Sequence, residues 1–268
     1  MTNATRWRCA QRLSILLLAL PLAAQTPAAL IAPTGTLRAA FLGDNPALGK
    51  VDAKTGTVTG PVADFVQEFA RRLGVPYALI PSSGARDITE RLNAGTADLG
   101  FFAYNAGRAK EVDFSPAWLL MPNTYIVRAD SPIRKVADAD RAGVHIQAVK
   151  GDTQDVYLSN NLKNTKVDAI AAMPSPQEIE TLLLDGKIDA LAANRQRLEL
   201  IGSQFPKLRV VADDYFVAAQ SIAIAKGNPA RLEAVNKVLD EILATSVVKD
   251  SIARGGLRGV NAAPPKTR

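Results

Sequence analysis

The chain contains very little cysteine and histidine. Among its 268 residues, Cys9 is the only cysteine and His145 the only histidine. One residue of each kind excludes a disulfide framework, a dithiol motif and a zinc cluster. His145 stands in an apolar stretch without partner histidines or cysteines, so a packed side chain is a better interpretation than a catalytic or metal-binding one. We therefore expect neither a metal nor a cofactor.

Recognisable catalytic motifs are also lacking. The sequence has no zinc-protease pair, no P-loop and no nucleophile elbow. Ser246 and Lys249 have the spacing of a penicillin-recognising nucleophile, but the companion triad at Lys54 precedes them instead of following. One face of a terminal helix explains this pair better, and a solvated turn explains the acidic pair Asp138 and Asp140. No residue is predicted to be catalytic.

One apolar run, residues 13–24, is too short to span a bilayer comfortably. It follows three arginines and ends in small residues, which is typical of a cleaved secretory signal peptide at residues 1–24. The alternative is a retained membrane anchor, which usually needs about 20 apolar residues. Cys9 precedes the run and therefore cannot be the lipid-modified cysteine of a lipoprotein. Export without disulfides fits a bacterial periplasm.

Clustered positive charge is absent, although the pI is about 9.5. Lysines and arginines are scattered, and no basic run with interleaved aromatic residues appears. The net charge of +6 falls to +3 when the three arginines of the predicted signal peptide are removed. We expect a monomer with no nucleic-acid partner.

An alternation of strands and helices is what the sequence does contain. Strand 36–42 precedes a helix that begins at Pro61, repeats apolar residues at helical spacing and closes at Gly74. Strand 75–81, helix 85–95 and the wholly apolar strand 97–104 complete a first series. This alternation predicts a parallel α/β sheet.

A second α/β series repeats the pattern. Its predicted elements are strand 143–150, a helix from about Thr153, strand 166–172, helix 175–186 and strand 187–193. Leu92, Gly95 and Asp98 in the first series are echoed by Leu183, Gly186 and Asp189 in the second, which supports two similarly built lobes. Strand 220–226 and a long helix from Pro229 into the 250s follow, and residues 261–268 are predicted to be disordered.

Three loops at strand ends predict a ligand cleft between two lobes. The loop after the first strand supplies Asn45, and the loop after strand 97–104 supplies Tyr104, Asn105 and Arg108. The turn 150–155 places backbone N–H groups and a threonine at a helix N-terminus, which suits an anion.

The order of these segments resembles the family 3 extracellular solute-binding proteins, the polar-amino-acid receptors of ABC importers. The matching pieces, which include "GPVADFVQEFARRLGV", "RAKEVDFSPAW", "VHIQAVKGDTQD" and "LLLDGKIDAL", span Leu37 to Gly259. The resemblance implies an α/β, two-lobed periplasmic-binding-protein fold of type II, with two hinge strands and a ligand cleft between the lobes. We place the crossings near 127–131 and 212–217, lobe 1 at 34–127 plus 217–260, and lobe 2 at 128–216.

The resemblance also implies roles for two residues. Arg108 stands six residues before Phe114, as does the family arginine that grips the ligand α-carboxylate. A planar guanidinium fork suits a carboxylate, and a structural salt bridge is the alternative. Thr153 matches the second-lobe threonine that takes the other side of the carboxylate, and a plain helix N-cap is its alternative.

The departures from the family pattern bear on the ligand. Asn194 stands where the family has the aspartate that binds the ligand amine, and an amide cannot neutralise an ammonium. Asn45 replaces the aromatic residue that usually stacks on the ligand, and Phe102 and Tyr104 either pack on the ligand or fill the core. Asp152 at the cleft mouth is placed to meet a cation. The predicted contacts are Asn45, Phe102, Tyr104, Asn105, Arg108, Asp152, Thr153, Gln154 and Asn194.

We therefore predict a non-enzymatic periplasmic protein that captures a small carboxylate-bearing solute, either amino-acid-like or a deaminated acid. Its partners are then the anionic or zwitterionic solute and an inner-membrane ABC permease. Two alternatives remain open at this stage. One is a periplasmic enzyme resembling cyclohexadienyl dehydratases, and the other is an accessory or sensor protein of a dehydrogenase or a membrane kinase.

Overall fold

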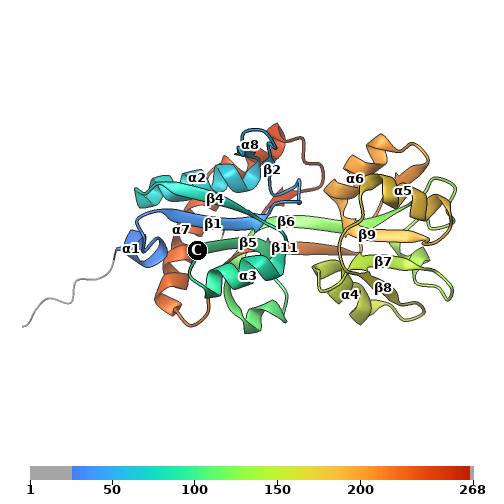
Figure 1. Ribbon diagram of the computed structural model, residues 1–268, viewed down its shortest axis with the longest axis horizontal. Helices are drawn as coiled ribbons and strands as arrows, with labels where there is room; N and C mark the ends of the chain where they lie inside the picture. The colour runs from blue at the N-terminus through green and yellow to red at the C-terminus, as the bar shows by residue number, and fades with distance from the viewer. Residues whose placement is uncertain (1–25, 266–268) are drawn as a thin grey trace, which may run out of the picture.

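The computed structural model describes residues 26–265, which form two lobes lying side by side (Figure 1). The predicted signal peptide lies outside the described residues. The helices are α1 (Pro27–Ile31), α2 (Pro61–Leu73), α3 (Ala85–Asn93), η1 (Arg108–Lys110), η2 (Val136–Ala139), α4 (Thr153–Asn161), α5 (Pro176–Leu184), α6 (Arg195–Gln204), α7 (Pro229–Leu243) and α8 (Val247–Arg254). The strands are β1 (Leu37–Leu42), β2 (Lys50–Val51), β3 (Val58–Thr59), β4 (Tyr77–Ser82), β5 (Leu99–Ala103), β6 (Val112–Arg128), β7 (Ile146–Val149), β8 (Val167–Ile170), β9 (Ala190–Asn194), β10 (Leu208–Val210), β11 (Phe216–Ala225) and β12 (Asn261–Ala262).

One mixed sheet runs through both lobes in the described part of the chain. Its strand order is β4-β1-β5-β11-β6-β9-β7-β8, and β10 and β12 also pair with β6. In lobe 1, β1 is parallel to β4 and β5, while in lobe 2, β7 is parallel to β8 and β9. The antiparallel pair β6 and β11 lies between these two parallel sets, and Figure 1 shows both strands running from one lobe to the other.

Strand β6 carries the chain from lobe 1 into lobe 2. Met121 belongs to the hydrophobic core of lobe 1, whereas Tyr125 belongs to that of lobe 2. The crossing therefore lies at about residues 122–124, a few residues before the segment 127–131 expected from the sequence. The reason is that β6 continues unbroken across the boundary and pairs with β9 from Asn123 onward.

The return crossing lies at the start of β11. Tyr215 packs in the lobe 2 core, and Ile222 packs in the lobe 1 core. Tyr215 also donates its backbone N–H to the Asn123 carbonyl, so the two crossings are tied together. The return crossing therefore lies between residues 215 and 222, and it overlaps the end of the predicted segment 212–217.

The lobe 1 core has two layers because alternate residues of a strand face opposite sides of the sheet. On one side, Phe41 packs with the apolar face of α2, which includes Phe65. On the other side, Ala40 packs with Ile88 of α3. Helix α2 begins at Pro61, as predicted, and ends where Gly74 adopts the left-handed conformation (φ 69°).

The internal sequence echo marks equivalent turns in the two lobes. Gly95 (φ 67°) and Gly186 (φ 68°) both follow a helix, and each precedes a strand that starts after an aspartate. Asp98 accepts a hydrogen bond from the backbone N of Arg38 at 2.9 Å, and Asp189 accepts one from the backbone N of His145 at 2.8 Å. Each aspartate thereby fixes the start of the neighbouring parallel strand.

The C-terminal region differs from the prediction in two respects. The expected single long helix is divided into α7 and α8, and at the break both the hydroxyl and the backbone N–H of Thr245 donate to the Ile242 carbonyl. In place of the disorder expected from residue 261, Asn261 and Ala262 form β12 against β6, and Ala263 donates its N–H to the Trp118 carbonyl. Residues 266–268 lie outside the described part.

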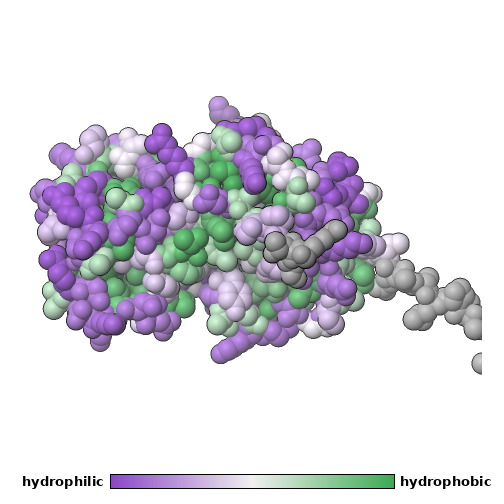
Figure 2. Space-filling view, turned by 180° about the vertical axis from the view of Figure 1, so that it is seen from behind, coloured by the Kyte–Doolittle hydropathy of each residue, from purple (hydrophilic) through white to green (hydrophobic). Residues whose placement is uncertain are grey.

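The outer surfaces of the two lobes are mainly hydrophilic, and hydrophobic residues appear at the waist between them (Figure 2). Among the described residues, no helix has the length and apolar character needed to cross a membrane.

Candidate functional site

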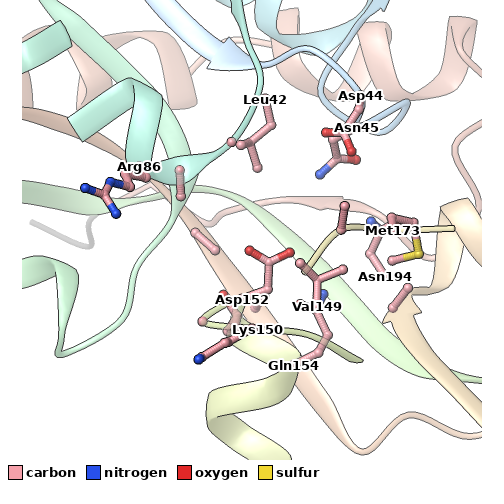
Figure 3. A pocket seen from close by; sticks show the side chains of 18 of the residues that line it. Leu42, Asp44, Asn45, Arg86, Val149, Lys150, Asp152, Gln154, Met173 and Asn194 are labelled. Atoms are coloured by element: carbon pink, nitrogen blue, oxygen red, sulfur yellow. The ribbon is translucent and has the colours of Figure 1, made fainter. Parts of the chain in front are cut away.

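A cavity of about 770 Å³ lies between the lobes, where the carboxyl ends of the parallel strands meet. Lobe 1 contributes the ends of β1, β4 and β5, and lobe 2 contributes the ends of β7, β8 and β9. Figure 3 shows Asp44 and Asn45 entering from one side and Asp152, Gln154 and Asn194 from the other. The predicted contacts that line it are Asn45, Arg108, Asp152, Thr153, Gln154 and Asn194.

Arg108 reaches from lobe 1 across to lobe 2. Its Nη1 donates to the Ala103 carbonyl at 3.0 Å, and its Nη2 donates to the Gly151 carbonyl at 3.1 Å. The same Nη2 lies 3.4 Å from Oδ1 of Asp152. Only 14% of the side chain is exposed, and this burial lowers the pKa of Arg108 while the Asp152 carboxylate opposes the shift. The site thus holds a nearly buried guanidinium at the lobe interface.

Asp152 occupies the N-cap position of α4 but makes no side-chain cap bond. Its side chain is 46% exposed, and it lines the cavity. Partial desolvation between the two lobes raises the pKa of Asp152, and the nearby Arg108 opposes that rise. Figure 3 shows this carboxylate directed toward the centre of the cavity.

The N-terminus of α4 also places Thr153 and Gln154 at the cavity. Thr153 is buried as the first helical residue, so the N–H groups of this turn are directed toward the lobe interface. Gln154 donates from Nε2 to Oδ1 of Asn123 at 2.6 Å, which ties α4 to the crossing strand β6. A helix N-terminus in such a position favours an anion.

Asn194 is the last residue of β9 and the N-cap of α6. Its Oδ1 accepts a hydrogen bond from the backbone N of Arg197 at 2.9 Å. One lone pair of the oxygen is thereby used within the helix turn, which leaves the second lone pair and the amide NH₂ group for other partners. On lobe 1, Asn45 is used in the same way, because its Oδ1 accepts from the backbone N of Ala47 at 3.1 Å.

Three predicted contacts are not brought into the cavity. Phe102 is fully buried in the lobe 1 core, where it packs edge-on against Phe114. Tyr104 is 47% exposed and also packs edge-on against Phe114. Asn105 turns its Oδ1 to the backbone N of Arg108 at 2.8 Å. Of the two alternatives for Phe102, the structure has the core one, because β5 directs Phe102 to the α3 side of the sheet; Tyr104 and Asn105 do not line this cavity.

Sequence reasoning missed a second charge pair across the cleft. Arg197 of α6 donates from Nη2 to the Asp44 carbonyl at 2.6 Å and to Asp44 Oδ2 at 3.0 Å. The two residues are 153 positions apart, so no local pattern connects them. Asn123 and Gln220 of the two crossing strands also line the cavity without having been predicted. Their only sequence signal is a polar side chain within a long apolar strand.

The cavity wall carries as many bases as acids. The bases are Arg86, Arg108, Lys150 and Arg197, and the acids are Asp44, Glu90, Glu111 and Asp152. None of the lining residues in the described part of the chain is aromatic. The wall is therefore formally neutral and offers hydrogen bonds in place of stacking.

His145 differs from its prediction. The side chain is 62% exposed instead of packed, with Nδ1 lying 3.4 Å from Asp168 Oδ2, because it precedes β7 at the surface. Within residues 26–265 no group of three or more His, Cys, Asp or Glu side chains is placed to hold a metal ion.

Comparison with known proteins identifies the type of this fold and site. The family model of bacterial extracellular solute-binding proteins, family 3, matches residues 37–253. The L-cystine-binding protein TcyJ of Escherichia coli (strain K12) is 26% identical over 191 residues, which cover 70% of each chain.

Solved structures agree with this fold. An amino acid ABC transporter substrate-binding protein of Streptococcus pneumoniae, AbpA, bound to L-arginine, has a TM-score of 0.68 at 21% identity, covering 84% of this chain and 96% of that one. An ancestral amino acid-binding protein, described as a precursor of cyclohexadienyl dehydratase, has a TM-score of 0.67 at 23% identity, with the same coverage of 84% and 96%. The predicted two-lobed α/β fold and the predicted family are confirmed.

Proposed function

This chain belongs to family 3 of the bacterial extracellular solute-binding proteins, and from that membership we propose that it captures a small carboxylate-bearing solute in the periplasm and delivers it to an ABC importer. Arg108 carries this proposal. Its guanidinium is nearly buried, stands at the junction of the two lobes and lines the cavity. A carboxylate bound there contacts both lobes and therefore favours their closed arrangement.

The surroundings of Arg108 support an anion at this point. The first turn of α4, which follows the Gly151 carbonyl that Arg108 contacts, adds N–H groups and the Thr153 hydroxyl. A fork of N–H donors facing a helix N-terminus suits both oxygens of one carboxylate. Binding of this kind uses no catalytic step. The L-cystine-binding protein TcyJ and the substrate-binding protein AbpA, to which this chain is similar, are themselves binding proteins.

A thermal-shift panel on residues 26–268, unfolded and refolded to remove carried-over solute, tests the proposal. Each standard amino acid is paired with its 2-hydroxy acid. A solute at about 100 times its Kd stabilises the protein by roughly 2.7 kcal/mol, which raises the midpoint measurably. We expect at least one carboxylate-bearing compound to do so.

The variant Arg108→Ala is expected to weaken that binding by about 100-fold or more, since loss of one partner from a buried charge pair costs roughly 2–5 kcal/mol. Arg86→Ala is the matched control, because Arg86 lines the cavity but is 92% exposed and pairs with Glu90 of its own helix. Equal effects of the two variants, or no stabilisation by any compound, would contradict the proposal.

A dehydratase is the alternative function that the sequence left open. Only Asp152 favours it, because burial raises the pKa of this carboxyl, as a general acid requires. Incubation with prephenate while product absorbance is followed distinguishes the two functions. We expect no turnover, and steady product formation that Asp152→Asn abolishes would replace binding with catalysis.

A further inference from the structure

Arg108 and Asp152 form a pair of adjacent opposite charges on one wall of the cavity. They come from different lobes and lie 3.4 Å apart between Nη2 and Oδ1. Within the described residues, this is the only side-chain hydrogen bond of the Asp152 carboxylate, and 46% of the side chain is exposed at the cavity. An ionised carboxylate can accept hydrogen bonds at both of its oxygens. The second oxygen of Asp152 therefore has bonding capacity directed at the cavity.

We propose that Asp152 binds the α-ammonium group of the solute while Arg108 binds its carboxylate, an inference that rests on the proposed function. The solute is then an α-amino acid. In such a molecule the two charged groups are attached to one carbon, so they are as close together as the two protein charges. The family's ammonium-binding carboxylate would thus have moved from position 194, at the end of β9, to position 152, at the start of α4.

Asn194 is a weaker partner for an ammonium than a carboxylate is, because its amide carries no charge. Its amide oxygen accepts from the Arg197 backbone N–H, and the remaining NH₂ group is a donor, which an ammonium repels. On the opposite wall, the oxygen of Asn45 is likewise used by the Ala47 backbone N–H. Asp152 is the cavity acid nearest to the carboxylate-binding guanidinium.

The charges of the wall also favour a zwitterion over a simple anion. A carboxylate on Arg108 lies beside the Asp152 carboxylate, and two like charges in an enclosed site repel strongly. Asp44 and Asp155 add further negative potential at Asp152. An ammonium on the same solute cancels this repulsion. A deaminated acid has no such group, so the hypothesis of a solute without an ammonium is disfavoured at this wall.

Calorimetric titration tests the inference with the best-binding amino acid from the thermal-shift panel and its 2-hydroxy acid as probes. Wild type is expected to bind the amino acid at least tenfold more tightly than the hydroxy acid. Asp152→Asn is expected to weaken amino-acid binding by about 100-fold and to leave hydroxy-acid binding unchanged or tighter. The preference for the ammonium-bearing probe is then lost, which a merely structural change does not produce.

Two further variants separate recognition from lobe closure. Asp44→Asn removes the other interlobe ion pair and is expected to reduce the preference for the ammonium-bearing probe far less than Asp152→Asn does, because Asp44 makes no hydrogen bond to the Arg108–Asp152 pair. The double variant Asp152→Asn, Asn194→Asp returns the acid to the family position and is expected to restore part of the preference.

The possible outcomes distinguish this inference from the function on which it rests. If Asp152→Asn changes both affinities equally, or wild type binds the hydroxy acid as tightly as the amino acid, the ammonium site is refuted while carboxylate binding stands. If neither probe binds and Arg108→Ala has no effect, the proposed function fails and the inference fails with it.

Discussion

The Arg108 side chain is fixed by neighbours from its own lobe. Oδ1 of Asn105 accepts a hydrogen bond from the Arg108 backbone N–H at 2.8 Å, and the guanidinium carbon of Arg108 lies 5.6 Å from the centroid of the Phe102 ring. A cation over an aromatic face is stabilised by about 0.5–2 kcal/mol. Phe102 and Asn105, which the sequence suggested as solute contacts, therefore act by holding the arginine in place.

At the residue scale, Asp152 gives a prediction for pH. Burial raises the pKa of Asp152 above its ordinary value of 3.8, so the folded protein binds a proton at higher pH than the unfolded chain does. The ionised carboxylate therefore reduces stability at neutral pH, and this penalty disappears as the pH falls through the raised pKa toward 3.8.

Urea unfolding of solute-free wild type and Asp152→Asn, from about pH 7 to about pH 4, measures this effect. Because the asparagine does not titrate, we expect wild type to gain stability relative to the variant as the pH falls. The opposite trend would mean that Arg108 stabilises the ionised carboxylate more than burial opposes it.

At the scale of elements, the contact between α3 and β5 positions one wall of the cavity. Helix α3 supplies Arg86 and Glu90 to the lining, and it packs on the sheet through Ile88 and Leu92. Gly100 of β5 lies directly under these two side chains. A Cβ at this position would come within 2.6 Å of the Ile88 side chain and 2.9 Å of the Leu92 side chain.

Gly100→Ala is therefore expected to destabilise the protein by about 1–3 kcal/mol, because α3 must shift to relieve the overlap. The midpoint of urea unfolding measures this loss. Gly202→Ala in α6 is the control, since its Cβ makes only an ordinary contact at 3.5 Å and alanine favours a helix. A neutral result at Gly100 would show that α3 is not seated as closely as the structure has it.

At the scale of the whole molecule, two ion pairs join the lobes across the cavity, and each lobe supplies the arginine of one pair and the aspartate of the other. Arg108 of lobe 1 meets Asp152 of lobe 2, and Arg197 of lobe 2 meets Asp44 of lobe 1. In the described part of the chain, β6 and the start of β11 carry the backbone between the lobes. The polar contacts across the cavity thus add to the two crossings in joining the lobes, in the arrangement of a protein that opens and closes by a hinge.

Arg197→Gln removes both bonds to Asp44 and is expected to lengthen and broaden the distance between the lobes in the solute-free protein. Spin labels on cysteines introduced at Lys54 and Lys166 measure that distance, since residues 26–268 contain no native cysteine. Arg86→Gln is the control, because this cavity arginine is bonded within its own helix. Identical distance distributions for the three proteins would show that the Arg197 contact does not hold the lobes together.

The sequence by itself determined the α/β alternation, the helix starting at Pro61 and the equivalent turns at Gly95 and Gly186. Each of these depends on local burial or local backbone conformation, which residue periodicity and glycine placement encode directly. The position of Arg108 after a buried strand was also predictable, because the carboxyl end of a parallel strand opens toward the cleft.

Only the tertiary structure decided which side chains meet. Arg108 and Asp152 are 44 residues apart, and their contact depends on where β6 crosses between the lobes and on the register of β9 against it. The burial of Phe102 away from the cleft and the use of the Asn194 oxygen in a helix cap follow from side-chain direction. Composition and spacing contain no information on side-chain direction across two lobes, because it is set by packing against elements distant in the chain.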